Sequence, residues 1–230
     1  MRVIKGRMKP INLSFAACGF LGIYHLGAAS AFCKHGKRLL KDVQAFAGAS
    51  AGSLVASVLL TAPEKIEDCN RFTYQFAEET RKQSFGAVTP GYDFMARLRS
   101  GMESILPPHA HELAQDRLYV SITNTRTRQN YLVSRFPSRE DLIKVLLASS
   151  FVPIYAGLRP VEYQGQKSSL CGVHSEPQHT RDRLCIGFPL EQNLSRVLST
   201  DLSIMRGFLP DFLLSDITKE QEPSPGILPP

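Results

Sequence analysis

The fold of this protein is decided by residues 43–60, which read VQAFAGASAGSLVASVLL. The first five, 43–47, are mostly apolar, as in a buried strand, and 53–60 form an apolar run that fits a helix. Five small residues separate the two: Gly48, Ala49, Ser50, Ala51 and Gly52. We therefore expect a strand, a sharp turn and a helix that Pro63 stops.

A unit of the same kind comes earlier in the chain. Residues 11–16 predict a short buried strand, 18–22 a glycine-containing turn, and 23–34 an apolar helix that ends near Gly36. Repeated strand, turn and helix order implies an α/β fold with a parallel sheet. Both turns then close the same edge of that sheet.

Later segments extend the α/β pattern. Charged and apolar residues recur periodically over 63–82, which predicts an amphipathic helix lying on the surface. Residues 118–123 and 129–133 predict neighbouring strands joined by a polar turn. Residues 140–149 predict a further helix.

Composition divides the chain into three parts. At 230 residues, 43% of them hydrophobic, the chain can bury the core of one medium domain, which we assign to 11–167. Residues 1–10 form a basic extension before it. At 168–230 the composition becomes rich in Ser, His, Gln and Pro, and we expect a poorly ordered tail with at most one short apolar helix at 204–217.

Charge follows the same division. The formal net charge is +6, and the tail at 168–230 carries five Lys/Arg and eight Asp/Glu, so residues 1–167 carry +9. A basic body favours anionic lipid surfaces or nucleic acid, but these basic residues do not gather into one tract. We therefore expect a diffuse attraction to membranes and no nucleic-acid partner.

The start of the chain has features of a targeting segment. Four basic residues within the first nine precede the apolar stretch 11–32, and no acidic residue comes before Asp42. These features fit a signal peptide, a membrane anchor or a mitochondrial transit peptide. Three glycines and several polar residues interrupt the stretch, however, so we favour a buried strand and helix over a membrane span.

Cysteine usage argues against disulfide frameworks and structural metal. The five cysteines are odd in number and irregularly spaced, and no two of them form a Cys-x-x-Cys pair. We expect no metal and no other cofactor.

Ser50 is the candidate nucleophile. Gly48, Ala49, Ser50, Ala51 and Gly52 form a Gly-x-Ser-x-Gly pentapeptide at a predicted strand-to-helix turn, which is the context of a nucleophile elbow. Such a turn is so sharp that its neighbours must be small. The helix that follows points its amides and its positive end at the serine, where negative charge would develop. The alternative is a small-residue turn that merely packs closely, and the flanking strand and helix favour catalysis over it.

The earlier turn, 17–22, offers a second functional element. Backbone amides just before a helix can donate to an anion, so this loop could supply an oxyanion hole. The loop also has the form of a dinucleotide fingerprint in which Ala17 replaces the first glycine and Asp42 stands where a ribose-binding acid would. We disfavour a nucleotide-dependent enzyme, because the first turn should be the tightest and no phosphate-binding lysine follows either glycine turn.

Together these motifs resemble a known family. Residues 14–22, SFAACGFLG, followed by Gly-Ala-Ser-Ala-Gly, closely resemble the patatin-like phospholipases, whose domain is abbreviated PNPLA. The resemblance runs from about 11 to 167 and includes 148–153, ASSFVP, which is similar to the segment before the family's last motif. It implies an α/β, patatin-like sandwich, a parallel sheet with helices on both faces, truncated or altered at the C-terminal end.

The resemblance also implies a reaction. Members hydrolyse or transfer fatty acyl groups of glycerolipids or retinyl esters, as triacylglycerol lipases, phospholipases or transacylases, with a serine and an aspartate and no histidine. Ser50 would be the nucleophile, and the backbone amides of Ala17, Cys18 and Gly19 would bind the oxyanion. The family's aspartate stands in an Asp-Gly-Gly or Asp-Gly-Ala motif on a later loop, where it takes the serine proton.

This chain departs from that pattern. None of its aspartates is followed by glycine, and Leu170 falls about where the family's aspartate should be. A leucine cannot accept a proton, and general-base assistance is typically worth about 10²- to 10⁴-fold in rate. We therefore expect low or absent activity in this form.

Other residues offer little replacement for the base. Asp182 lies in the tail with His174 and His179, but a Ser-Asp-His order would require a histidine after Asp182, and none follows. The remaining histidines precede it and fit helix or loop positions: His25, His35, His109 and His111. We expect none of these groups to replace the aspartate.

Two functions remain. The first is a serine lipid acyl hydrolase or transacylase of compromised activity, which the intact elbow favours. The second is a non-catalytic lipid-binding or regulatory form, which the missing aspartate favours. In either case we expect lipid esters and a membrane or lipid-droplet surface as partners, and peripheral attachment in the cytoplasm or in mitochondria.

Overall fold

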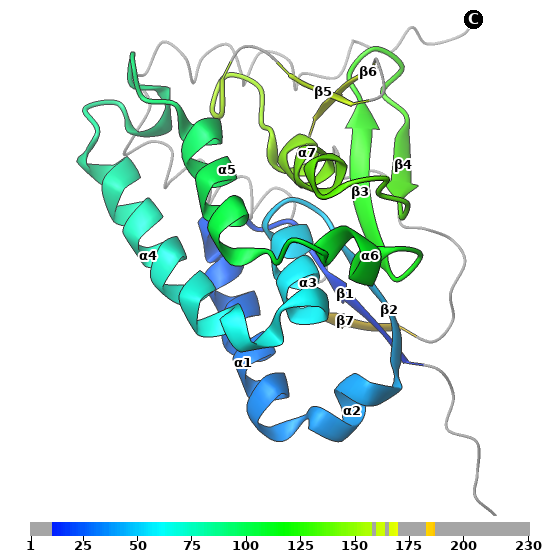
Figure 1. Cartoon of the computed structure of the whole chain (residues 1–230). Coiled ribbons are helices and arrows are strands. Elements are labelled where there is room, and N and C mark those ends of the chain that lie inside the picture. The colour runs from blue at the N-terminus through cyan, green and yellow to red at the C-terminus, as the bar shows by residue number, and fades with distance from the viewer. Residues whose placement is uncertain (1–10, 158–159, 164–165, 170–182, 187–230) are drawn as a thin grey trace, which may run out of the picture.

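The computed structural model describes residues 11–157, 160–163, 166–169 and 183–186 (Figure 1). The predicted basic extension at 1–10 and the predicted helix at 204–217 lie outside these residues. The described strands are β1 (Ile11–Phe15), β2 (Val43–Gly48), β3 (Leu118–Asn124), β4 (Asn130–Val133), β5 (Val161–Tyr163), β6 (Gln166–Ser169) and β7 (Arg183–Ile186). The described helices are α1 (Gly22–His35), α2 (Lys37–Asp42), α3 (Ala51–Thr61), α4 (Ile66–Lys82), α5 (Phe94–Ile105), α6 (Ala110–Ala114) and α7 (Arg139–Ser150), with the 3₁₀ turns η1 (Gly19–Leu21), η2 (Pro63–Lys65) and η3 (Gly86–Val88).

The described strands form one mixed sheet. Its order is β5-β6-β3-β2-β1-β7, and β4 also pairs with β3. β7, β1, β2 and β3 run parallel, whereas β4, β5 and β6 are antiparallel to their neighbours. The repeated strand, turn and helix units therefore build a parallel centre, and the β3–β4 hairpin adds an antiparallel part. The predicted α/β class is confirmed.

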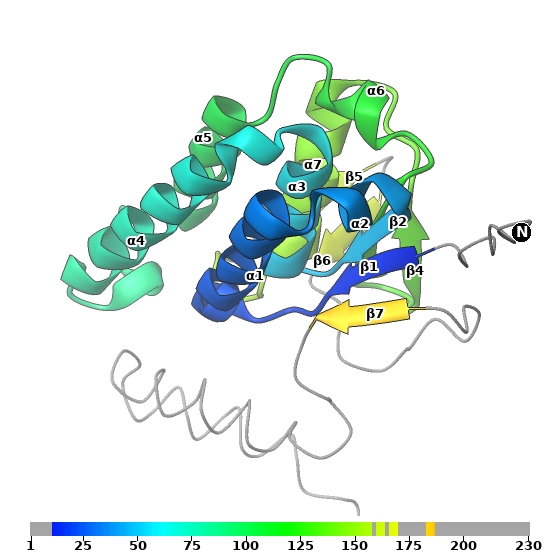
Figure 2. The same cartoon turned by 90° about the horizontal axis from the view of Figure 1, so that it is seen from below.

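One face of the sheet carries the core. The side chains on this face are almost fully buried: Leu13, Phe15, Phe46, Leu118, Val120 and Ile122. They alternate with half-buried residues such as Ser14, Ala47 and Tyr119, as the two-residue period of a strand requires. α3 contacts β1, β2 and β3, and α7 contacts β3 and β5, and both helices lie on one side of the sheet in Figure 2. Burial of these apolar side chains is the main stabilising contribution to the fold.

α4 is the amphipathic surface helix that the charge pattern of 63–82 predicts. Ile66 and Phe76 are buried on its inner side, whereas Tyr74 is 67% exposed. The helix packs against α1 and α5 and lies at the outside of the helix layer (Figure 1). Acidic residues in its first turn and basic residues in its last turn complement the helix dipole.

The structure also contains helices that the sequence pattern does not predict. α2 has six residues and α6 has five, too few for an apolar period to show. α5 has twelve residues and is capped by Asp93, whose carboxylate accepts a hydrogen bond from the Ala96 amide at 2.8 Å. The capping residue Asp93 was thus a sequence signal for the start of α5, and a search for apolar periodicity does not detect it.

Part of the tail forms strands, although its composition predicts poor order. β6 extends to Ser169, and β7 pairs in parallel with β1. Leu184 and Ile186 suit a strand, but four residues in β7 are too few to give a periodic signal. The rest of the tail lies outside the described residues, and the domain boundary at 167 stays a prediction.

We predict that Ile122→Ala in β3 destabilises the fold by about 2 to 5 kcal/mol, because it removes a fully buried side chain and leaves a cavity. The matched control is Leu132→Ala in the neighbouring strand β4. Leu132 is 40% exposed, and its loss should change stability by about 0.5 kcal/mol or less. Chemical denaturation of the three proteins measures both effects, and equal losses would contradict the assignment of the buried face.

Candidate active site

Ser50 lies at a sharp turn between β2 and α3. β2 ends at Gly48, α3 begins at Ala51, and Ser50 has a φ of 51° and a ψ of −131°. A positive φ is uncommon for a residue with a side chain, and such strain costs about 1 to 3 kcal/mol. The strand, turn and helix predicted around the Gly-x-Ser-x-Gly pentapeptide are confirmed, and the strain falls on the serine itself.

Two glycines make room for this turn. A Cβ atom on Gly52 would lie 2.3 Å from the Phe15 carbonyl oxygen and 2.4 Å from that of Ala16. A Cβ atom on Gly48 would lie 2.5 Å from the Ser53 amide nitrogen. All three distances are shorter than real Cβ atoms tolerate. Glycine is therefore needed at both positions for close packing of α3 against the ends of β1 and β2.

Both backbone groups of Ser50 are held by hydrogen bonds. Its carbonyl accepts from the Ser53 amide at 2.8 Å and from the Ser53 hydroxyl at 2.7 Å. Its amide donates to the Ser149 hydroxyl at 2.8 Å. The residue is only 7% exposed, and none of the described residues forms a hydrogen bond with its hydroxyl. The Ser50 amide is therefore occupied and cannot serve as an oxyanion donor, whereas no hydrogen bond to a described residue fixes the side chain.

The loop after β1 lies beside this turn. The Ala49 amide donates to the Phe15 carbonyl at 3.3 Å, and a Cβ atom on Gly22 would lie 3.1 Å from the Ala51 Cβ. Gly19 has a φ of 53°, a backbone conformation that favours glycine. Because β1 and β2 are parallel neighbours, the two turns meet at one edge of the sheet, as the sequence predicts.

The predicted oxyanion donors lie in this loop, directly before α1. Within 11–157 and the other described segments, the amides of Ala17 and Gly19 donate to no backbone carbonyl. Cys18 precedes η1, and its carbonyl accepts from the Leu21 amide at 3.0 Å. Amides at the start of a helix attract negative charge, which fits an oxyanion hole. The assignment of Ala17, Cys18 and Gly19 to that role stays a prediction.

His25 supports the same loop from α1. Its Nε2 lies 3.0 Å from the Ala16 carbonyl oxygen, which can only accept, so Nε2 carries the proton and donates. The ring packs edge-on against Phe15, with centroids 5.6 Å apart, and the residue is only 7% exposed. Burial lowers the pKa of His25 below 6.5, and the hydrogen bond to Ala16 opposes that shift. His25 is therefore a neutral donor to the loop at pH 7.

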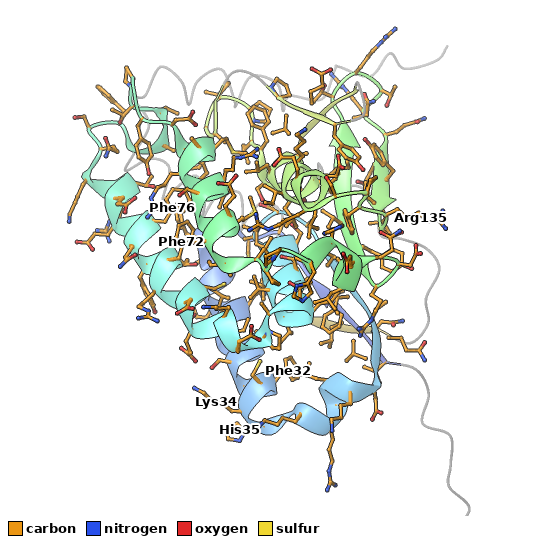
Figure 3. All side chains as sticks on the ribbon, viewed as in Figure 1. Phe32, Lys34, His35, Phe72, Phe76 and Arg135 are labelled. Carbon is orange, nitrogen blue, oxygen red and sulfur yellow. The ribbon has the colours of Figure 1, made fainter. Side chains whose placement is uncertain are left out.

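An aromatic cluster flanks the loop: Phe20, Phe72, Phe76, Phe94 and Tyr155. Phe20 of η1 lies 5.4 Å from Phe76 and 6.2 Å from Phe94, centroid to centroid. Phe94 in turn lies 5.4 Å from Tyr155. Figure 3 shows Phe72 and Phe76 on the side of α4 that faces the neighbouring helices. The predicted oxyanion loop therefore borders an apolar wall built from α4, α5 and the segment after α7.

β6 runs toward the turn that carries Ser50. Val120 of β3 pairs with Gly48 at the end of β2 and, on its other side, with β4. Further along β3, Thr123 pairs with β4 and, on its other side, with Ser169 of β6. β2 and β6 thus lie on the same side of β3. Because β6 is antiparallel to β3, its direction leads from Thr123 back toward the end of β2.

Four of the five aspartates in the described segments are engaged elsewhere, and the fifth, Asp42, ends α2. Asp93 caps α5, and Asp141 bonds to Ser138 at the start of α7. Asp68 and Asp116 form ion pairs with surface lysine and arginine residues. No hydrogen bond joins the Ser50 hydroxyl to an aspartate, glutamate or histidine of these segments.

The described histidines provide neither a base for Ser50 nor a metal site. His35 ends α1, His109 precedes α6 and His111 lies within it, which are helix and loop positions as predicted. Where the chain is described, no group of three or more His, Cys, Asp or Glu could hold a metal ion. His174, His179 and Asp182 lie outside the described residues.

Sequence reasoning missed Ser149 as a site residue. It belongs to the ASSFVP segment at 148–153, is fully buried, and contacts the Ser50 amide from 99 positions away in the chain. Two successive serines at the end of an apolar helix were the available signal. That signal does not reveal which distant amide the first of them binds.

We predict that Gly52→Ala destabilises the protein by about 1 to 3 kcal/mol or more. The reason is that the added Cβ would overlap two backbone carbonyl oxygens that cannot move aside. The matched control is Gly27→Ala on α1, where nothing lies within 4 Å of an added Cβ. That change should be neutral or stabilise the helix by up to about 1 kcal/mol. Thermal unfolding separates the two variants, and a stabilising Gly52→Ala would refute the close packing of α3 on β1.

We predict that folding stability falls as pH drops below about 6.5, in part through His25. The pKa of His25 is lowered in the folded state, so the unfolded chain binds the proton first. The contribution of neutral His25 is therefore fully present above the unfolded pKa and is lost as pH falls through the folded pKa. His25→Gln retains a donor without a titrating group, and its urea denaturation curves should change less with pH. Identical pH dependence of both proteins would contradict this role.

Comparison with known proteins agrees with this geometry. The family described as Patatin-like phospholipase matches residues 13–171. Human Patatin-like phospholipase domain-containing protein 4 is 86% identical over 160 residues, which are 70% of this chain and 63% of that protein. Human Patatin-like phospholipase domain-containing protein 2 is 37% identical over 159 residues, 69% of this chain and 31% of that protein. Human Omega-hydroxyceramide transacylase is 33% identical over 156 residues, 68% of this chain and 29% of that protein.

The chain spans less than two thirds of the length of these curated relatives. Among solved structures, VipD from Legionella pneumophila aligns with 85% of this chain over 52% of the VipD chain, at 15% sequence identity and a TM-score of 0.46. The family match begins in β1, includes both turns of the candidate site and ends shortly after β6. The resemblance of residues 14–22 and 48–52 is thus confirmed, and the chain belongs to the patatin-like phospholipase family and has its α/β fold.

Proposed function

We propose that this protein is a serine acyl hydrolase or transacylase of lipid esters, with Ser50 as the nucleophile and with low activity because its general base is missing. The strained strand-to-helix turn at Ser50 is the observation that carries the proposal. The relatives include a 1-acylglycerol-3-phosphate O-acyltransferase and an omega-hydroxyceramide transacylase, both named for acyl transfer. Acyl transfer is therefore the chemistry that this geometry supports best.

Each part of the site would serve one step of the reaction. The Ser50 Oγ attacks the ester carbonyl carbon, and the carbonyl oxygen becomes an oxyanion. The loop amides of Ala17, Cys18 and Gly19, together with the positive end of α3, would stabilise that charge. The serine proton passes to a base and then to the leaving alcohol. Water or a second alcohol finally releases the acyl group, which gives hydrolysis or transfer.

The missing part is the proton acceptor. β6 runs toward the elbow on the same side of β3 as β2, so a carboxylate soon after Ser169 would be delivered to the region of Ser50. Leu170 is the next residue of this chain, and it cannot take a proton. Without a base Ser50 keeps the weak nucleophilicity of an ordinary hydroxyl.

The aromatic cluster beside the oxyanion loop supports a fatty acyl chain as the group that is bound. The ring of Phe94 in α5 contacts the ring of Tyr155 in the segment after α7. Two exposed apolar side chains precede these two residues in the sequence. Phe85 is 49% exposed and Ile154 is 50% exposed. In the proposed function these two side chains would lie against the lipid surface. None of the helices that the structure describes is long and apolar enough to cross a bilayer.

We further propose glycerolipids or retinyl esters as the lipids and a peripheral, cytoplasmic location on lipid droplets or membranes. The net charge of +9 on residues 1–167 supports attraction to anionic lipid surfaces. The proposed chemistry calls for no cofactor, because the nucleophile and the oxyanion donors are protein groups and the base that it lacks would be a side-chain carboxylate.

The alternative function is a non-catalytic lipid-binding or regulatory form. One specific observation favours it: the Ser50 hydroxyl has no hydrogen bond to any carboxylate or imidazole of the described segments. A fluorophosphonate probe separates the two functions in a folded sample. Labelling at Ser50 supports acyl chemistry, and absence of labelling supports lipid binding alone.

We predict that restoring the motif with Leu170→Asp and Cys171→Gly raises ester hydrolysis by about 10²- to 10⁴-fold, the usual worth of general-base assistance. Gly172 already supplies the last residue of Asp-Gly-Gly. The measurement compares this chain, the repaired chain and the repaired chain with Ser50→Ala, using a short-chain ester and then triacylglycerol in emulsion. A repaired chain no faster than its Ser50→Ala control would show that the proposed dyad is wrong.

A further inference from the structure

Ser149 connects two parts of the candidate site that are far apart in the sequence. The residue lies near the end of α7 and is fully buried. Its hydroxyl donates to the Ser121 carbonyl of β3 at 2.7 Å and accepts from the Ser50 amide at 2.8 Å. One hydroxyl, acting as donor and acceptor, therefore ties the nucleophile turn to the central part of the sheet.

This bridge falls where the pairing of β2 with β3 stops. The last paired residues are Gly48 and Val120. Beyond them the chain leaves β2 for the turn, so the Ser50 amide has no strand partner there. Ser121 is the next residue of β3, and its carbonyl accepts from Ser149. A side-chain hydroxyl thus satisfies the buried Ser50 amide and the part-buried Ser121 carbonyl where the pairing of β2 with β3 ends.

We propose that Ser149 is a positioning residue that holds the strained Ser50 turn in its reactive conformation. The inference rests on the proposed function, because it gives Ser149 a part in the reaction of Ser50. α3 already holds the Ser50 carbonyl through Ser53. The bond from Ser149 fixes the other backbone group of Ser50, which α3 does not reach.

Loss of the Ser149 hydroxyl would leave the buried Ser50 amide and the part-buried Ser121 carbonyl without this partner. Unpaired buried groups are unfavourable, so the turn would relax toward a less strained conformation. A nucleophile displaced by about 1 Å can lose about 10²-fold in rate. Ser149 therefore acts on the reactivity of Ser50 through the backbone, without touching the substrate.

Ser150 is the matched control. It follows Ser149 in α7 and is 8% exposed, and its buried hydroxyl has no hydrogen-bond partner in the described part of the chain. Ser150→Ala therefore removes a hydroxyl from the same helix end without removing a hydrogen bond. Ser149→Thr is the rescue variant, since it keeps a hydroxyl that can make both bonds.

The first experiment measures hydrogen exchange of the Ser50 amide by NMR in the full chain, and it needs no activity. We expect a protected amide in the unaltered chain and about 10-fold faster exchange in Ser149→Ala, which corresponds to one lost buried hydrogen bond. Ser150→Ala and Ser149→Thr should leave the rate unchanged. Equal rates in the two alanine variants would overturn the proposal. If Ser149→Ala does not fold, the exchange rate of the Ser50 amide in the unaltered chain is the test. An unprotected Ser50 amide there would exclude the hydrogen bond to Ser149.

The second experiment measures esterase kinetics in the chain repaired with Leu170→Asp and Cys171→Gly. Ser149→Ala should lower kcat by at least about 10-fold while KM changes little, and Ser149→Thr should restore kcat. An unchanged kcat in Ser149→Ala would refute the positioning role and leave the proposed function intact. A repaired chain without Ser50-dependent hydrolysis would refute the proposed function. The hydrogen-exchange experiment would still test whether Ser149 binds the Ser50 amide.

Discussion

The left-handed turn at Ser50 is the constraint on which the site depends. A residue with a side chain is held at a φ of 51° because α3 packs directly onto the ends of β1 and β2. That packing requires Gly48 and Gly52, since a Cβ at either position would overlap backbone atoms. The turn then directs the start of α3 at the serine, which is where an acyl-transfer reaction needs positive potential.

Strain at one residue persists only if its surroundings hold it, and here the supports come from three separate parts of the chain. Ser53 binds the Ser50 carbonyl from within α3, and Ser149 binds the Ser50 amide from α7. His25 binds the Ala16 carbonyl in the neighbouring loop from α1. The candidate site is therefore held by hydrogen bonds to backbone groups of the turn and the neighbouring loop. The Ser50 hydroxyl forms no hydrogen bond with the described residues.

For the proposed reaction, the same sheet indicates where a base would have to lie. β6 shares a side of β3 with β2 and runs toward the elbow, so a base carried just after β6 would lead toward Ser50. Leu170 occupies the position that follows β6. Four of the five described aspartates bond at helix starts or pair with surface cations, and none of the five forms a hydrogen bond with Ser50. The strained turn at Ser50 therefore forms in this fold without a hydrogen bond from the Ser50 hydroxyl to a described carboxylate.

Local patterns in the sequence determined the strand, turn and helix around Ser50, the similar unit before it, and the amphipathic helix α4. These features depend on residue size and on periods of two or 3.6 residues, which neighbouring residues reveal. Short elements such as α6 and β7 left no such period. Only the tertiary structure decided that Ser149 binds the Ser50 amide and that β6 faces the elbow, because both depend on strand order, and burial of the whole sheet sets that order.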